Sequence, residues 1–199
     1  MTLLNTLTAT ILATYVGSSA LGAEPGTAAD PDKPSSYAGQ QQRAIKTLAE
    51  SEVAALLAGD GMGFAKAAEL NDYPGPAHAL ELIAALELST TQVDQTRALM
   101  NQHKSRAREM GARVVAAERE LNSLFASQHA TADAVEAATR QIGLLQASLR
   151  AEHLKTHIAQ RALLTDDQVR KYGELRGYRS EGAAGTTHPE PAGHGAGHH

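Results

Sequence analysis

The stretch LSTTQ at residues 88–92 returns as LTDDQ at residues 164–168, and this repeat decides the fold. In each copy a hydroxyl residue stands three positions before a glutamine: Ser89 precedes Gln92, and Thr165 precedes Gln168. The hydroxyl can accept a hydrogen bond from the glutamine N–H, while the glutamine side chain accepts one from the backbone N–H of the hydroxyl residue. This arrangement is a capping box, which starts a helix. Each cap contributes about 1 kcal/mol.

A leucine and a valine flank each capping box. Leu88 and Val93 enclose the first copy, and Leu164 and Val169 enclose the second. Their spacing is that of a hydrophobic staple, in which the residue before the cap packs on the fourth residue of the helix. One copy alone would indicate only a good helix start. Two copies at the ends of a long helical region are more specific.

Apolar residues recur every seven positions after the first copy. Up to about Ser127 the two recurring sets are Val93, Met100, Ala107, Val114 and Leu121, and Thr96, His103, Met110, Ala117 and Leu124. After Thr131 the period continues with Val135, Ile142, Leu149, Thr156 and Leu163. This period is typical of helices that pack along a partner in coiled-coil fashion. Because the link at residues 128–131 is short, we expect an antiparallel hairpin.

Shorter helices flank this hairpin. We expect them at about residues 37–57, 64–70, 77–86 and 165–175, with breaks at the Gly-rich residues 59–63 and the turn at 71–76. The predicted fold class is therefore all-α, a long antiparallel hairpin with short flanking helices. A thin hairpin with few aromatic residues buries little surface, which favours a homodimer.

Composition excludes several classes of function. The chain has 199 residues, 42% of them hydrophobic and 4% aromatic, with no cysteine and a net charge of −4. Disulfides, thiol catalysis and cysteine zinc sites are therefore excluded, and nothing favours nucleic-acid binding. The GxSxG, P-loop and HExxH patterns are absent from the sequence, so we expect a protein that is not an enzyme.

The N-terminal region is typical of an exported protein. Residues 1–23 contain no charged side chain and end in small residues, which favours a signal peptide; an uncleaved membrane anchor is the alternative. Residues 24–36 predict a disordered leader, residues 37–178 the helical domain, and residues 179–199 a disordered tail rich in His and Gly. The expected location is the periplasm.

Three histidines of the predicted hairpin are candidate metal ligands. His153 and His157 are four residues apart and share a helix face. Pairing the heptad positions of the two helices places His103 opposite Thr156, between those two histidines. Such a group could bind Zn²⁺, Ni²⁺ or Co²⁺, with Glu109 or Glu152 as an oxygen ligand or a supporting partner. Alternatively, the three are polar residues that are hydrogen-bonded to their neighbours.

Further histidines occur in the predicted tail. They are His188, His194, His198 and His199. Flexible histidines capture transition metals when several share one ion, although the tail could equally be a solvated end without a role. We expect that the protein requires no cofactor. Zinc or another divalent transition metal is the candidate ligand.

Basic residues outnumber acidic ones on the first hairpin helix. Four of these basic residues are candidates for client binding: Arg97, Lys104, Arg108 and Arg113. A basic amphipathic surface would attract unfolded acidic proteins rapidly and reversibly. A merely solvated helix face is the alternative.

A signal peptide, a helical hairpin and two Leu-Ser/Thr-x-x-Gln motifs together resemble the Spy/CpxP-type periplasmic proteins, the LTxxQ family. The stretches NDYPGPAHALELIAALEL (71–88) and HLKTHIAQRALLTDDQVRKYGELRGY (153–178) are similar to a branch labelled periplasmic heavy-metal sensor. The resemblance covers about residues 37–178, and the first motif departs from the pattern in having Ser89 in place of threonine.

The resemblance implies an antiparallel dimer shaped as a thin, curved cradle, ATP-independent chaperone activity and a link to metal stress. We therefore predict a periplasmic chaperone that holds unfolded envelope proteins. The alternative is a sensor or scavenger of Zn, Ni or Co that uses the hairpin and tail histidines. A third alternative is a helical adaptor that docks to a membrane sensor partner.

Overall fold

The computed structural model describes residues 34–179 of the chain. The predicted signal peptide, residues 24–33 of the predicted leader and the tail from residue 180 lie outside this range. The chain divides into two units, residues 1–38 and residues 39–199. Of the first unit only residues 34–38 are described, and they form a turn in which the N–H of Ala38 donates to the carbonyl of Ser35 at 2.9 Å.

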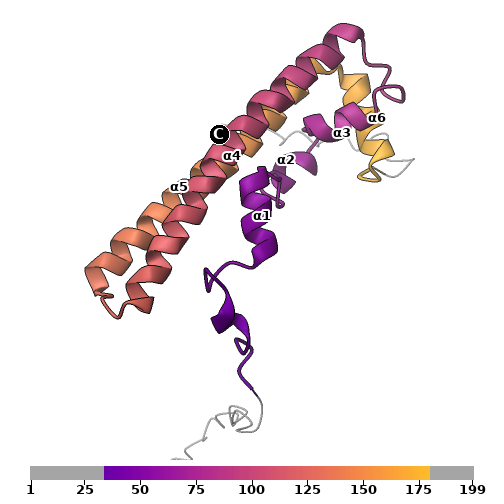
Figure 1. The fold of residues 1–199 in the computed structure, drawn as a ribbon. Coiled ribbons are helices and arrows are strands. Elements are labelled where there is room, and N and C mark those ends of the chain that lie inside the picture. Colours follow the sequence, from indigo (N-terminus) through magenta and orange to yellow (C-terminus); the bar gives the residue numbers. More distant parts are fainter. Residues whose placement is uncertain (1–33, 180–199) are drawn as a thin grey trace, which may run out of the picture. The chain divides into compact units, whose positions relative to one another are not determined.

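The described part of the second unit consists of helices, and no strand occurs in it. Figure 1 shows the two longest helices lying side by side as a hairpin. The elements are the 3-10 turn η1 (Gln40–Gln42), α1 (Glu50–Ala58), α2 (Lys66–Glu69), α3 (Pro76–Glu81), α4 (Thr90–Ala126), α5 (Ala132–Leu163) and α6 (Asp166–Leu175). The predicted all-α hairpin is thus confirmed. Within residues 34–179, no helix combines the length and apolar character needed to cross a membrane.

Both predicted capping boxes are formed. Ser89 Oγ accepts from the N–H of Gln92 at 3.2 Å, and Gln92 Oε1 accepts from the N–H of Ser89 at 3.0 Å. Thr165 and Gln168 repeat both contacts, at 3.2 Å and 3.0 Å. These caps fix the first residues of α4 and α6, as the sequence predicted.

The two leucine–valine staples belong to one hydrophobic cluster, although they are more than seventy residues apart in the chain. Leu88, Val93, Leu164 and Val169 are all buried in it, together with Leu86 and Tyr172. The starts of α4 and α6 therefore pack on each other, and this cluster closes the open end of the hairpin, opposite the α4–α5 link (Figure 1).

A second cluster fills the middle of the hairpin. Its members from the predicted heptads are Ala107, Val114 and Ala117 of α4 and Ile142 and Leu149 of α5, and Leu145 of α5 packs with them. Ile45 and Leu56, from the segment before the hairpin, are buried against them. The heptad pattern therefore identified the hairpin core correctly, and the N-terminal segment covers one side of it.

The predicted helix at residues 37–57 is wrong in its first half. Residues 40–42 form only η1, and α1 begins at Glu50. Between them the chain is held to α4: the N–H of Lys46 donates to Asn122 Oδ1 at 3.3 Å, and the Thr47 hydroxyl donates to Glu118 Oε2 at 2.9 Å. These contacts bring Ile45 into the core, which a continuous helix would not allow.

The predicted helices at 64–70 and 77–86 are also shorter than expected. α2 spans Lys66–Glu69 and α3 spans Pro76–Glu81. Beyond α3 the chain turns, with Glu87 in the left-handed region at φ 51°. This turn brings Leu86 and Leu88 into the cluster around the capping boxes, so long-range packing overrides the local preference for helix.

A glycine permits the close crossing of α1 and α4. A Cβ atom added at Gly111 would lie 2.0 Å from the backbone oxygen of Leu56, which is impossible without displacing a helix. Gly59 ends α1 in the left-handed conformation at φ 68°, and a Cβ there would lie 3.0 Å from the backbone nitrogen of Arg108. α1 therefore reaches α4 because Gly111 lacks a side chain, and a side chain at Gly59 would be both strained and tightly packed.

Candidate metal centre

A pocket of about 690 Å³ lies between the hairpin and the short helices that precede it. The Gly-rich loop at residues 59–63, α2 and the start of α3 form one wall, and α4 and α5 form the other. Four histidines line it: His78, His103, His153 and His157. Because imidazole is the commonest metal-binding side chain, this concentration makes the pocket the candidate site.

His103 and His153 form a buried pair between the two helices of the hairpin. Their ring centroids are 4.5 Å apart in an edge-to-face arrangement, and the two side chains come from α4 and α5. Phe64 packs on the other side of His153, with its ring centroid at 5.5 Å. The Nδ1 atom of His103 lies 3.0 Å from Thr156 Oγ1, so the predicted register of His103 opposite Thr156 is confirmed.

Hydrogen bonding fixes the tautomer of His103. The hydroxyl of Thr156 donates to the carbonyl of Glu152 at 2.9 Å, so its oxygen can only accept from His103 Nδ1. The proton of His103 therefore resides on Nδ1, and Nε2 keeps its lone pair. The Glu152 carboxylate lies 3.7 Å from the same Nδ1 atom. Metal-binding histidines are commonly held by such a partner on the other ring nitrogen.

His153 has a polar atom without a partner. The side chain is 4% exposed, and Nε2 contacts no hydrogen-bonding group among the described residues. Burial, helped by the neighbouring His103, His157 and Lys104, lowers the pKa of His153 to about 4. Burial also lowers the pKa of His103, although Glu152 opposes this effect. Both imidazoles are therefore neutral at neutral pH, which is the form that binds metals.

His157 lies apart from this pair. Its Nδ1 atom is 2.8 Å from the carbonyl of Tyr73 and 3.4 Å from Glu69 Oε2, so it donates to the turn between α2 and α3. Of the three imidazoles predicted to lie at one level of the hairpin, only those of His103 and His153 do so. Within residues 34–179, no group of three or more His, Asp or Glu side chains is arranged to hold a metal ion.

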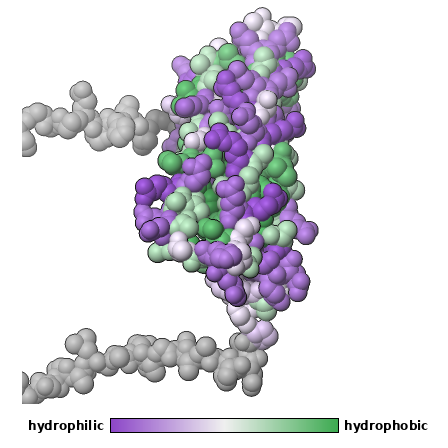
Figure 2. All heavy atoms as spheres, turned by 60° about the vertical axis from the view of Figure 1, so that its left-hand side comes forward, coloured by the Kyte–Doolittle hydropathy of each residue, from purple (hydrophilic) through white to green (hydrophobic). Residues whose placement is uncertain are grey.

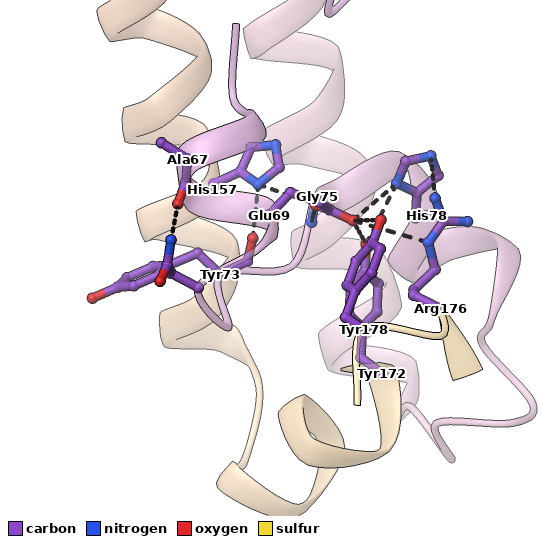
Figure 3. Close-up of polar contacts among 10 residues, drawn as sticks. Ala67, Glu69, Tyr73, Gly75, His78, His157, Tyr172, Arg176 and Tyr178 are labelled. Atoms are coloured by element: carbon purple, nitrogen blue, oxygen red, sulfur yellow. Dashed lines mark hydrogen bonds and ion pairs between the residues drawn. The ribbon is translucent and has the colours of Figure 1, made fainter. Parts of the chain in front are cut away.

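Glu69 organises the far wall of the pocket and was missed by the sequence analysis (Figure 3). Its Oε1 atom accepts hydrogen bonds from the hydroxyls of Tyr172 and Tyr178, and Oε2 accepts from the N–H of Gly75 at 3.1 Å. Burial and the contact with Glu69 raise the pKa of Tyr172. The carboxylate therefore ties α2 to α6. A lone glutamate in a short helix gives no local sign of such a role.

Two basic residues predicted to bind clients have a structural role. Lys104 Nζ lies 2.9 Å from Asp60 Oδ1 and 3.2 Å from the carbonyl of Gly59. Arg108 Nε donates to the carbonyl of Ala58 at 3.3 Å. Both cations thus satisfy the C-terminal end of α1, where carbonyl groups favour positive charge. Arg97 forms an exposed pair with Asp94, and Arg113 is exposed.

The remaining predicted site residues are placed as follows. Glu152 lies beside His103 as predicted for a supporting partner, whereas Glu109 is exposed and does not line the pocket. The tail histidines at 188, 194, 198 and 199 lie outside the described residues.

A family model described as heavy-metal resistance matches residues 53–171, more than half of the chain and all of the pocket's helices. The chain belongs to the heavy-metal resistance family. This is the Spy/CpxP-like family of LTxxQ helical proteins, so the resemblance seen in the sequence is confirmed. Members of the heavy-metal resistance family are typically secreted or periplasmic. Neither the curated proteins nor the solved structures include a significant match.

Proposed function

We propose that this protein captures heavy-metal ions in the periplasm, with His103 and His153 as ligands inside the pocket. The observation that supports this most directly is the buried Nε2 atom of His153, which has no hydrogen-bond partner in residues 34–179. A buried polar atom without a partner costs about 1–3 kcal/mol. Coordination of a metal ion would offset that cost.

The surroundings of the pair suit this role. His103 is held through Nδ1 by Thr156, with Glu152 behind, which leaves Nε2 for a metal. The low pKa of His153 means that protons do not compete with a metal ion down to about pH 4. The tail histidines at 188, 194, 198 and 199 would add further capture sites for metal ions.

Metal titration of chelator-treated protein tests this proposal. Calorimetry with Zn²⁺, Ni²⁺, Co²⁺ and Ag(I) would use a background in which the four tail histidines are alanine, so that only hairpin sites contribute. We expect the double variant His103→Ala/His153→Ala to lose at least about tenfold in affinity. His129→Ala, at the exposed link between α4 and α5, is the matched control and should bind normally. Unchanged affinity of the double variant for all four ions would overturn the proposal.

A chaperone is the second candidate, supported by large apolar side chains on the surface of the hairpin. Leu144 is 61% exposed, Ile158 57% and Phe125 59%. Figure 2 shows hydrophobic atoms reaching the surface between hydrophilic ones on one face of the molecule. Such a surface could hold unfolded clients weakly, with Arg97 and Arg113 attracting acidic segments. A homodimer that covers this surface is the alternative.

Suppression of client aggregation, with and without zinc, separates the two candidates. Suppression by metal-free protein would make chaperone activity primary. Suppression only with zinc, or none, would favour the metal-capture function. Sedimentation of the same samples tests the predicted dimer. Binding only to one membrane sensor, without general client binding, would support the adaptor alternative.

A further inference from the structure

Two methionines share the pocket with the histidine pair. Among the described residues the methionines are Met62, Met100 and Met110, and the first two line the pocket. Met100 is half-buried and lies one turn before His103 on α4, so the two side chains share a helix face. Met110 packs against the hairpin core instead. The pocket therefore offers a thioether sulfur together with two imidazoles.

The carboxylates around the pocket already have cationic partners. Asp60 pairs with Lys104 at 2.9 Å, Glu152 with Arg106 at 3.8 Å, and Glu69 with Arg176 at 3.9 Å. The charge of a bound cation would therefore be only weakly compensated. Because the cost of burying an ion grows with the square of its charge, a monovalent ion costs about a quarter as much as a divalent ion of the same size.

The number of available ligands also favours a monovalent ion. Structural Zn²⁺ sites take about four ligands, and the described residues bring only two histidines together here. Cu(I) is a soft ion that thioether sulfur selects, and imidazole also binds it. Two imidazoles and one thioether therefore suit Cu(I) better than Zn²⁺, which the histidine pair alone would hold less tightly.

We propose that the pocket is selective for a soft monovalent ion, Cu(I) or its redox-inert analogue Ag(I), bound by His103, His153 and the sulfur of Met100. The inference rests on the proposed function, because it assumes that the histidine pair binds metal. It adds that Met100 determines which metal is bound. Met62, in the loop at residues 59–63, also lines the pocket and is 42% exposed.

Competition with a chromogenic Cu(I) chelator under anaerobic, reducing conditions tests the selectivity. The full-length protein carries alanine at the four tail histidines throughout. Met100→Leu should weaken Cu(I) binding by at least about tenfold and leave Zn²⁺ and Ni²⁺ binding unchanged. Met110→Leu is the matched control, because Met110 lies on the same helix and does not line the pocket. Equal Cu(I) affinity in Met100→Leu would overturn the inference.

Methionine methyl NMR on the protein with native Met100 gives a readout that does not depend on the folding of a variant. Addition of Ag(I) should shift the Met100 methyl resonance and leave that of Met110 in place. Zn²⁺, if held by the histidine pair alone, should shift the Met100 resonance much less than Ag(I) does. An unshifted Met100 signal at saturating Ag(I) would show that sulfur does not bind the ion.

Failure of the proposed selectivity can be distinguished from failure of the proposed function. If Zn²⁺ or Ni²⁺ binds through His103 and His153 while Cu(I) binding is insensitive to Met100, the selectivity is wrong and the proposed function stands. If no metal binding depends on the histidine pair, both are wrong.

Discussion

The side-chain amides of Gln92 and Gln168 are hydrogen-bonded to each other in both directions. Gln92 Nε2 donates to Gln168 Oε1 at 2.8 Å, and Gln168 Nε2 donates to Gln92 Oε1 at 3.2 Å. Each amide also donates to a carbonyl just before the other motif, at Leu163 and Leu86. The two capping boxes are thus one unit, which explains why both copies have glutamine where an isolated helix would accept glutamate equally well.

Replacing Gln92 by glutamate should destabilise the protein, although glutamate serves well in an isolated capping box. The carboxylate has no donor, so it would face the Gln168 oxygen and the Leu163 carbonyl without a hydrogen bond. We expect a loss of about 2 kcal/mol in the free energy of unfolding. Denaturant unfolding followed by circular dichroism measures it. Gln95→Glu, at an exposed position of the same helix, is the control and should have little effect.

Removing either capping hydroxyl should have a smaller effect. Ser89→Ala and Thr165→Ala each delete one acceptor for a backbone N–H, so each should cost about 1 kcal/mol. Thr90→Ala, at the next exposed position, should be close to neutral. Unchanged thermal stability in a cap variant would show that its capping box contributes nothing.

Adding one methyl group at the crossing of α1 and α4 should be strongly unfavourable. In Gly111→Ala the new Cβ meets the Leu56 backbone 2.0 Å away, so α1 must move off the hairpin. We expect a loss of about 2–3 kcal/mol. Gly143→Ala on α5 has open space and should instead gain about 0.5–1 kcal/mol. Equal thermal stability of the two variants would contradict the close crossing.

Metal-free protein should lose stability as the pH falls from about 6.5 towards 4. Burial lowers the pKa of His153 from 6.5 to about 4, so between these values the unfolded chain binds more protons than the folded one. The free energy of unfolding therefore rises with pH across this window, by up to about 3 kcal/mol from this residue. His153→Leu should flatten the dependence, whereas His129→Leu, at the exposed link, should not. The same steep slope in His153→Leu would assign the effect to other groups.

Deleting residues 180–199 should lower the number of metal ions bound without changing the fold. Arg179 is kept because its guanidinium pairs with Asp72. Metal stoichiometry by elemental analysis and helicity by circular dichroism are the two measurements. A loss of helical signal would show that the tail contributes to the helical domain, contrary to the sequence-based prediction.

Much of the hairpin and part of the site follow from local pattern. The seven-residue period fixes which faces of α4 and α5 meet, and so it placed His103 opposite Thr156 correctly. The same register predicted that His103 and His153 lie close together, as they do. The seven-residue period could not predict where the His157 ring points, because that ring is held by the Tyr73 carbonyl, eighty-four positions away in the chain.

The sequence by itself determined the helix starts, the hairpin and its register, because capping and hydrophobic spacing act within a few residues or along one helix face. Only the tertiary structure decided the rest. The Gln92–Gln168 pair, the carboxylate of Glu69 among two tyrosines and the pocket walls all join residues that are distant in the chain. Such contacts depend on how the short helices pack on the hairpin, and no local periodicity encodes that packing.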